Sequence, residues 1–455
     1  MKRREFISVA AAGSVALAAA SAQGQTPSAD SRWGAGHSGG RAQVSPGEPG
    51  RDYQPVITPN GAALPYRVVD GVKVFHLIAE AVEHEFAPGL IGRCWGFNGR
   101  VHGPTIEAVE GDRVRIYVTN RLPAATSIHW HGVHLPSGMD GVGGLTQPVI
   151  QPGETFRYEW TFRQHGTLMY HSHHDEMTQM AMGLMGLLIV HPRDPAEDDR
   201  ADRDFALLLS EWKIRPGTYR PDPSEMVDFN VLTMNARVWP GTDSLVVRTG
   251  QRVRVRLVNL SAMSHHPIHI HGHSFRVAET DGGGIPRAGQ WPETTVLVPV
   301  GSSRTLEFIA DNPGDWAVHC HMTHHVMNQM GHAGPPMIGV DAEVLDAAIQ
   351  PLVPGYMTMG HRGMGEHGQH VEHGMPVPEN SIPMVGGEGP FGYVSMGGMA
   401  TILKVRDHIT RYDDPGWYRH PQGTVAERVG AAALARDGIA APPPVEMPPD
   451  HEQHH

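Results

Sequence analysis

Cys320 is surrounded by residue types that bind soft and borderline metals. His319 and His321 lie on either side of it, and His325 and Met330 follow shortly after. A thiolate, an imidazole and a weak thioether are the ligand types of a blue-copper electron-transfer site. Because neighbouring side chains in a strand point to opposite faces, the two flanking histidines can face away from that site and reach a second one. The stretch therefore predicts a cysteine that joins two metal sites.

The chain also contains four pairs of histidines with a single residue between the members. The pairs are His129 and His131, His171 and His173, His269 and His271, and His319 and His321. In a strand, both side chains of such a pair lie on one face, about 7 Å apart. Eight imidazoles are more than one ion can use, so the pairs predict a cluster of several metals. Copper suits this ligand set, with zinc as the chemical competitor.

The histidine pairs occupy matching places in two halves of the chain. Residues 105–116 correspond to residues 244–255, and the histidine pair at 129 and 131 corresponds to the pair at 269 and 271. Similarity at a fixed offset is the signature of an internal repeat. We therefore expect a duplication, with a linker rich in proline and charge at residues 191–200.

Only the second half carries the further ligands of a mononuclear site. His266 precedes the third histidine pair, where the first half has no histidine, and Ser172 stands in the place of Cys320. His266, Cys320 and His325, with Met330 as the long axial ligand, predict one blue-copper site in the second half alone.

Sequence typical of strands and turns extends through both halves. The chain has 455 residues, of which 54 are glycine and 38 are proline, and residues 112–119 alternate between polar and apolar. These features favour an all-β protein built from β-sandwiches. A formal net charge of −12 and the lack of a Lys/Arg run argue against a nucleic-acid partner. Two cysteines cannot form a disulfide framework, and we expect Cys94 and Cys320 to be unpaired.

The two ends of the chain differ from its centre. Residues 1–22, with Arg3 and Arg4 before an apolar run, are predicted to be an export signal of the twin-arginine type, followed by a flexible leader at residues 23–52. We expect no membrane span and a protein that is periplasmic or otherwise exported. Residues 343–455 form a Met/His/Gly/Pro-rich extension, predicted to be flexible except at residues 399–406, which we expect to be ordered and to pack as a strand. Its methionines 357, 359 and 364 offer thioethers to Cu(I).

Together these motifs resemble the two-domain multicopper oxidases of the laccase type. The resemblance rests on residues 129–132, 171–173, 266–273 and 319–330, and it covers the chain from about residue 53 to residue 341. It implies two cupredoxin-like Greek-key sandwiches, at residues 53–195 and 203–342, and four coppers per chain. The implied ligands are His266, Cys320, His325 and Met330 for type 1 copper, His129 and His269 for type 2 copper, and His131, His171, His173, His271, His319 and His321 for the type 3 pair.

The same resemblance implies an activity and an assembly. A reducing substrate, either a phenol or aromatic amine or Cu(I), would give single electrons through Cys320 to the cluster, where dioxygen is reduced to water. Asp140 lies where related enzymes place a proton donor, although a turn-forming Asp-Gly explains this residue equally well. Two-domain relatives form homotrimers with the cluster between neighbouring subunits, and an intrachain cluster remains the alternative.

Two other classes of protein fit parts of the pattern. A copper nitrite reductase needs only three imidazoles at its catalytic metal and has its blue copper in the first domain, whereas this cysteine is in the second half. A non-enzymatic copper-binding or copper-tolerance protein would give the adjacency of Cys320 to His319 and His321 no purpose.

Overall fold

The computed structural model describes residues 45–327, 347, 351–352, 379–382 and 386–440. The expected export signal, most of the leader, Met330 and the methionines at 357, 359 and 364 lie outside these residues. Strands dominate the described part, so the all-β prediction is confirmed. No helix in the described part is both long and apolar enough to cross a membrane.

The first sandwich consists of a five-stranded and a four-stranded sheet. In the five-stranded sheet the order is β1-β2-β5-β7, with β3 also paired to β2. Its strands are β1 (Tyr66–Val69), β2 (Val72–Ala87), β3 (Leu90–Phe97), β5 (Arg113–Asn120) and β7 (Thr155–Thr161). The four-stranded sheet has the order β4-β9-β8-β6. Its strands are β4 (Gly103–Val109), β9 (Met185–His191), β8 (Gly166–Ser172) and β6 (Ile128–His131).

The second sandwich consists of a seven-stranded and a five-stranded sheet. The larger sheet has the order β11-β10-β13-β19-β15-β16, with β17 also paired to β15. Its strands are β11 (Val231–Met234), β10 (Arg203–Trp212), β13 (Arg252–Asn259), β19 (Ser302–Ile309), β15 (Phe275–Thr280), β16 (Gly283–Gly284) and β17 (Trp291–Glu293). The smaller sheet has the order β12-β23-β20-β14-β18. Its strands are β12 (Leu245–Arg248), β23 (Ala400–Arg406), β20 (Gly314–Cys320), β14 (His266–Ile270) and β18 (Thr295–Val298).

The remaining elements are short. They are the hairpin of β21 (Gly387–Gly389) and β22 (Gly392–Val394), the α-helices α1 (Glu176–Ala181) and α4 (Ala431–Arg436), and the 3-10 turns η1 (Ser137–Met139), η2 (Glu197–Asp199), η3 (Arg287–Gly289) and η4 (Thr323–Val326).

The two sandwiches repeat one topology. In the first, β2 pairs in parallel with β5 and β4 pairs in parallel with β9. In the second, β10 pairs in parallel with β13 and β12 pairs in parallel with β23. Strand β8 lies between β6 and β9, as β20 lies between β14 and β23. The duplication found in the sequence is therefore also a duplication of strand pairing.

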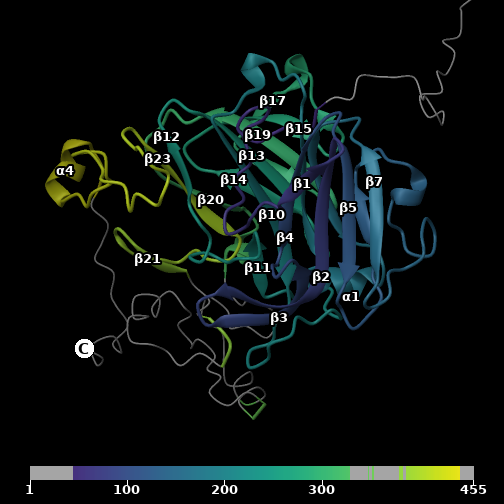
Figure 1. The fold of residues 1–455 in the computed structure, drawn as a ribbon. Helices are drawn as coiled ribbons and strands as arrows, with labels where there is room; N and C mark the ends of the chain where they lie inside the picture. The colour runs from purple at the N-terminus through teal and green to yellow at the C-terminus, as the bar shows by residue number, and fades with distance from the viewer. Residues whose placement is uncertain (1–44, 328–346, 348–350, 353–378, 383–385, 441–455) are drawn as a thin grey trace, which may run out of the picture. The chain divides into compact units, whose positions relative to one another are not determined.

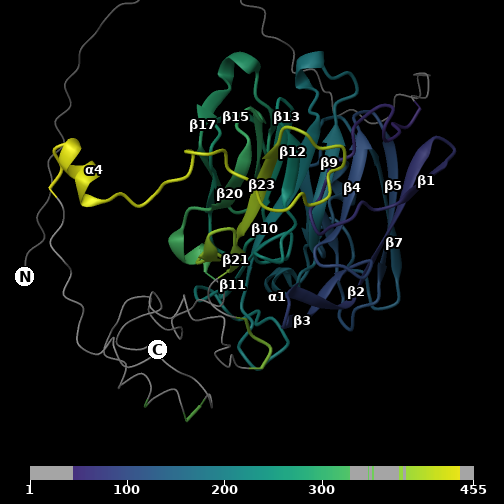
Figure 2. The ribbon, with the colours of Figure 1, turned by 90° about the vertical axis from the view of Figure 1, so that its left-hand side faces the viewer.

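Strand β23 joins the second sandwich from far along the chain. It lies beyond residue 342, where we placed the end of this domain, and it pairs with both β12 and β20 (Figures 1 and 2). Its buried pattern, with Ala400, Leu403 and Val405 almost inaccessible, explains why it occupies the middle of a sheet. Strand β20 thus ends at Cys320, and the chain pairs with β20 again from residue 400 onward.

Side chains that alternate along the strands form a separate core in each sandwich. Strand β5 follows this pattern, with Val114, Ile116 and Val118 fully buried and the intervening residues more exposed. Trp130 and Tyr170 fill the first core, while the second contains Ile268, Cys320 and Met399. Both cysteines are buried and unpaired, as expected.

Contacts between the sandwiches surround Arg256, which is 1% exposed. Its guanidinium donates to Thr167 Oγ1 of the first sandwich at 2.8 Å and pairs with Asp204 Oδ1 at 2.8 Å. Ser303 Oγ donates to the carbonyl oxygen of Thr167 at 2.8 Å. A buried arginine is tolerated here because its donors meet a carboxylate and a hydroxyl.

Candidate metal centres

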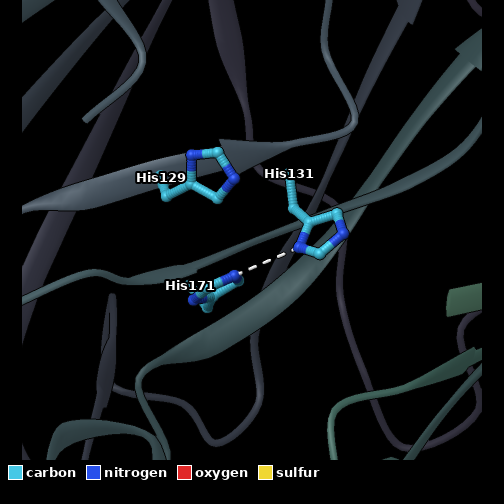
Figure 3. A group of neighbouring side chains, drawn as sticks. All are labelled: His129, His131 and His171. Atoms are coloured by element: carbon cyan, nitrogen blue, oxygen red, sulfur yellow. Dashed lines mark hydrogen bonds between the residues drawn. The ribbon is translucent and has the colours of Figure 1, made fainter. Parts of the chain in front are cut away.

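His129, His131, His171 and His173, here called the first histidine set, gather on one face of the first sandwich. Strands β6 and β8 pair with His129 opposite His171, and Figure 3 shows the rings of His129, His131 and His171 facing a common space. Each of these three residues offers a ring nitrogen within 4.8 Å of the others. The ring centroid of His173, just past β8, lies 5.4 Å from that of His129.

Backbone carbonyls fix which nitrogen these rings offer. The Nδ1 of His129 donates to the carbonyl oxygen of Asp140 at 2.8 Å, and the Nδ1 of His171 donates to that of Ser172 at 2.9 Å. The Nε2 of each ring then keeps a free lone pair, as metal ligation requires. Burial lowers the pKa of His171 to about 3 and also lowers the pKa of His131, so both rings stay neutral.

His269, His271, His319 and His321, here called the second histidine set, repeat this arrangement. His269 lies opposite His319 across β14 and β20. The Nε2 atoms of His271 and His319 are 3.1 Å apart. The Nδ1 of His269 donates to the carbonyl oxygen of Thr294 at 2.7 Å, and the Nδ1 of His319 donates to that of Cys320 at 2.8 Å. His269 and His319 thus offer the same nitrogen as His129 and His171.

His266, Cys320 and His325 converge on the other face of β20, and we call this group the cysteine site. The Sγ of Cys320 lies 3.7 Å from the Nδ1 of His266 and 3.5 Å from the Nδ1 of His325, and the two Nδ1 atoms are 3.2 Å apart. An ion at the centre of this triangle would lie about 2 Å from each donor, close to a metal–imidazole bond length. A trigonal thiolate and two imidazoles are the donor set of blue copper.

Without a metal, burial keeps the donors of the cysteine site uncharged, so an ion bound there would displace the proton of the thiol. Burial raises the pKa of the Cys320 thiol to about 12 and lowers the pKa of His266 to about 3. The Nε2 of His266 lies 2.6 Å from Ser261 Oγ, which leaves its Nδ1 as the ligand nitrogen. Met330, the expected axial ligand, lies outside the described residues.

The first sandwich has a hydrogen-bonded polar cluster in the place of the cysteine site. Thr126 Oγ1 and Ser172 Oγ both donate to Oε1 of the buried Gln179, whose amide donates to the carbonyl oxygen of Ala125 at 2.7 Å. Thr126 and Ser172 occupy the positions that correspond to His266 and Cys320. The cluster is satisfied without a metal, which agrees with the expectation of one such site per chain.

Two carboxylates lie beside the first histidine set. Asp140 holds His129 through its backbone oxygen, and its Oδ1 is 3.5 Å from the same ring nitrogen. Glu176, which we did not single out from the sequence, has Oε1 3.5 Å from His171 Nδ1 and Oε2 4.0 Å from His173 Nε2. The only sequence signal for Glu176 is its position three residues after His173.

The two histidine sets remain apart within one chain. Ring contacts join members within each set, and among the described residues none joins a member of one set to a member of the other. A cavity of about 420 Å³, lined by residues that include His84, His102 and Arg237, involves neither set.

Comparisons with known proteins agree with this geometry. Two family models, each described as multicopper oxidase, match residues 79–195 and 215–334. Copper resistance protein A of Escherichia coli is 29% identical over 60% of this chain and 51% of its own length, and Laccase-2 of Botryotinia fuckeliana is 32% identical over 57% and 50%. The chain spans about half the length of these curated relatives.

Two solved structures resemble the fold over most of their own length. The blue copper oxidase from Nitrosomonas europaea and the multicopper oxidase mgLAC each align with a TM-score of 0.55 and 26% identity. Each alignment covers 76% of this chain and 91% of the solved one. The resemblance therefore extends over both sandwiches.

Proposed function

Since the chain belongs to the multicopper oxidase family, we propose that it is an enzyme that couples one-electron oxidation of a reducing substrate to four-electron reduction of dioxygen to water. The observation that carries this proposal is the position of Cys320. Its side chain faces His266 and His325, while its chain neighbours His319 and His321 belong to the second histidine set. Bound copper would supply the one-electron redox chemistry, and Cys320 provides a covalent path between the two sites.

The ligand roles follow from the donor sets. His266, Cys320 and His325 would hold type 1 copper, with a methionine in the axial position. His129 and His269 would hold type 2 copper, and the type 3 pair would be held by His131, His171, His173, His271, His319 and His321. This gives four coppers per chain. The rings with one nitrogen held by a backbone carbonyl support the assignment.

Proton delivery is proposed for Asp140, which lies beside His129. Its carboxylate can pass a proton toward the space that the first histidine set surrounds, while its backbone oxygen keeps His129 in place. A substitution of the Asp140 side chain would test proton delivery alone, because the backbone carbonyl that holds His129 remains in every variant.

The separation of the two histidine sets supports a cluster shared between subunits. Each set offers four imidazoles, and no described ring contact brings them together in one chain. A head-to-tail ring in which the first set of one subunit meets the second set of the next would complete the cluster. We propose a homotrimer of this kind.

Two classes of substrate are proposed for the site. Phenols and aromatic amines would match the relative named laccase, and Cu(I) would match the relative named copper resistance protein A. The methionines at 357, 359 and 364, which we proposed as soft ligands for Cu(I), lie outside the described residues. The predicted export signal would place this activity in the periplasm or otherwise outside the cytoplasm.

Oxygen uptake by the copper-loaded protein tests the proposed function. We expect uptake with a phenol such as 2,6-dimethoxyphenol or with Cu(I), and loss of both activities in Cys320→Ser, which keeps the size of the side chain but removes the thiolate. A copper nitrite reductase would instead reduce nitrite, and a copper-binding protein would consume no oxygen with either reductant. Either of these results would contradict the proposal.

A further inference from the structure

Met399 lies directly beside Cys320, although almost eighty residues separate them in the chain. Cys320 N donates to the carbonyl oxygen of Met399 at 3.0 Å, and Met399 N donates to that of His325 at 2.9 Å. Strands β20 and β23 pair with His319 opposite Ala400, which places Met399 opposite Cys320. Residues opposite each other in antiparallel strands direct their side chains to the same face. The thioether of Met399 is therefore on the face where the cysteine site lies.

Burial places Met399 in the same apolar surroundings as the thiol. Both side chains are 0% exposed, and both belong to the hydrophobic core of the second sandwich. Methionine in a core is often only a flexible filler. Burial by itself therefore does not distinguish a ligand from packing.

The backbone before Met399 is shaped to approach the ligand loop closely. Gly398 has φ of +57°, and a Cβ at this position would lie 2.4 Å from the carbonyl oxygen of His325. A side chain there would push the strand away from His325. Gly398 thus allows the backbone of Met399 to approach both Cys320 and His325, two of the proposed copper ligands.

The internal repeat supplies the comparison that separates ligand from packing. In the first sandwich, Ser172 N donates to the carbonyl oxygen of Leu184 at 3.0 Å, the same bond that Cys320 makes to Met399. Leu184 is also 0% exposed and follows a glycine with positive φ, Gly183. The first sandwich therefore has a hydroxyl paired with an aliphatic side chain where the second has a thiol paired with a thioether. The sulfur atoms of Cys320 and Met399 therefore occur together at these two positions only in the sandwich that has the cysteine site.

We propose that Met399, and not Met330, is the axial ligand of the copper held by His266, Cys320 and His325, an assignment that rests on the proposed function. The spacing from Cys320 favoured Met330 because sequence motifs assume a short ligand loop. In this chain the proposed axial residue directly precedes β23, so the ligand loop runs from His325 to Met399 and contains the Met/His-rich stretch of the sequence.

The midpoint potential of the blue copper in the full-length holoprotein tests this assignment. A weak axial thioether stabilises Cu(II), and the axial ligand tunes the potential of such sites. We expect Met399→Leu to raise the midpoint potential with copper still bound, because leucine has a similar volume and Leu184 occupies the equivalent place. Met399→Gln should lower the potential and change the visible and paramagnetic spectra, because an amide oxygen is a stronger axial donor to Cu(II).

Met330→Leu and Met327→Leu are the matched controls, and both should leave the potential and the spectra unchanged. Met327 is 8% exposed and lies on the same ligand loop, so it reports the effect of a packing change alone. A shift in Met330→Leu together with unchanged Met399 variants would overturn the assignment while leaving the proposed function intact. A wild-type protein without blue absorption would contradict the proposed function and this assignment with it.

Discussion

At the scale of single residues, the same hydrogen bond recurs at each histidine set. His171 and His319 each donate from Nδ1 to the carbonyl oxygen of the next residue in the chain, Ser172 and Cys320. At Cys320 this means that the residue whose thiolate faces one proposed copper also orients, through its carbonyl, a ligand of the next. A change in the backbone at Cys320 would therefore disturb both sites.

Two histidines away from the metal centres contribute to the dependence of stability on pH. Burial lowers the pKa of His102 to about 3 and that of His84 to about 4. The unfolded chain has ordinary imidazoles with a pKa of about 6.5, so below that pH it binds protons that the folded chain does not. The free energy of unfolding is then fully retained above about pH 6.5 and falls as the pH decreases toward the folded pKa, by about 1.4 kcal/mol per pH unit for each group.

We predict that His102→Gln makes the stability of the metal-free protein less dependent on pH. The midpoint of urea unfolding, measured between pH 7.5 and pH 4, should fall less steeply in this variant because one buried histidine with a lowered pKa no longer contributes to the pH dependence. Ser210→Ala is the matched control, since it removes the oxygen that lies 3.0 Å from His102 Nε2 but keeps the imidazole. It should lower stability at every pH and keep the slope. An unchanged slope in His102→Gln would contradict the prediction.

At the scale of elements, strands β6, β8, β14 and β20 position most of the described ligand candidates. The exceptions are His173, His271 and His321, which directly follow these strands, and His325, which lies in η4. The sequence was sufficient to predict these strands, because a His-x-His pair indicates an extended segment with both imidazoles on the same face. It was also sufficient for the cysteine site, whose three described residues are close in type and spacing to a known ligand pattern. These predictions depend mainly on local geometry, which the spacing of residues within one segment reports.

The elements that the sequence did not place are those fixed by contacts between distant segments. The strand expected at residues 399–406 is present as β23, but its place beside β20 depends on the return of the chain after a long excursion, so Met399 carries no local signal of a ligand role. Gln179 was missed for a different reason. It lies seven residues after Ser172, whereas His325 lies five residues after Cys320, so the two loops cannot be aligned by counting. Its role appears only when its hydrogen bonds to Thr126 and Ser172 are known.

At the scale of the whole molecule, the sandwiches are joined through strand β8, which also carries His171 of the first histidine set. Arg256, Thr167 and Ser303 hold them together, and an apolar group that includes Met169 and Leu208 packs between them. Among the described residues, no ring contact joins the second histidine set to the first within the chain. The proposed trimer rests on that separation of the two sets.

Mixing inactive variants distinguishes a shared cluster from an intrachain cluster. One variant would carry His129→Ala and His131→Ala, and the other His269→Ala and His271→Ala. Each alone should be inactive. Co-expression should restore about a quarter of the wild-type oxidase activity, because in a random head-to-tail ring one interface in four pairs two intact sets. No recovery in co-expressed, assembled protein would show that each chain builds its own cluster.

Copper content per chain, measured together with visible and paramagnetic spectra, tests the central claim most directly. The account predicts four coppers per chain, with blue absorption from the cysteine site, a type 2 signal, and a spin-coupled pair that contributes no paramagnetic signal. Cys320→Ser should lose the blue absorption and keep the other three coppers. One copper per chain, or four coppers without blue absorption, would contradict the account.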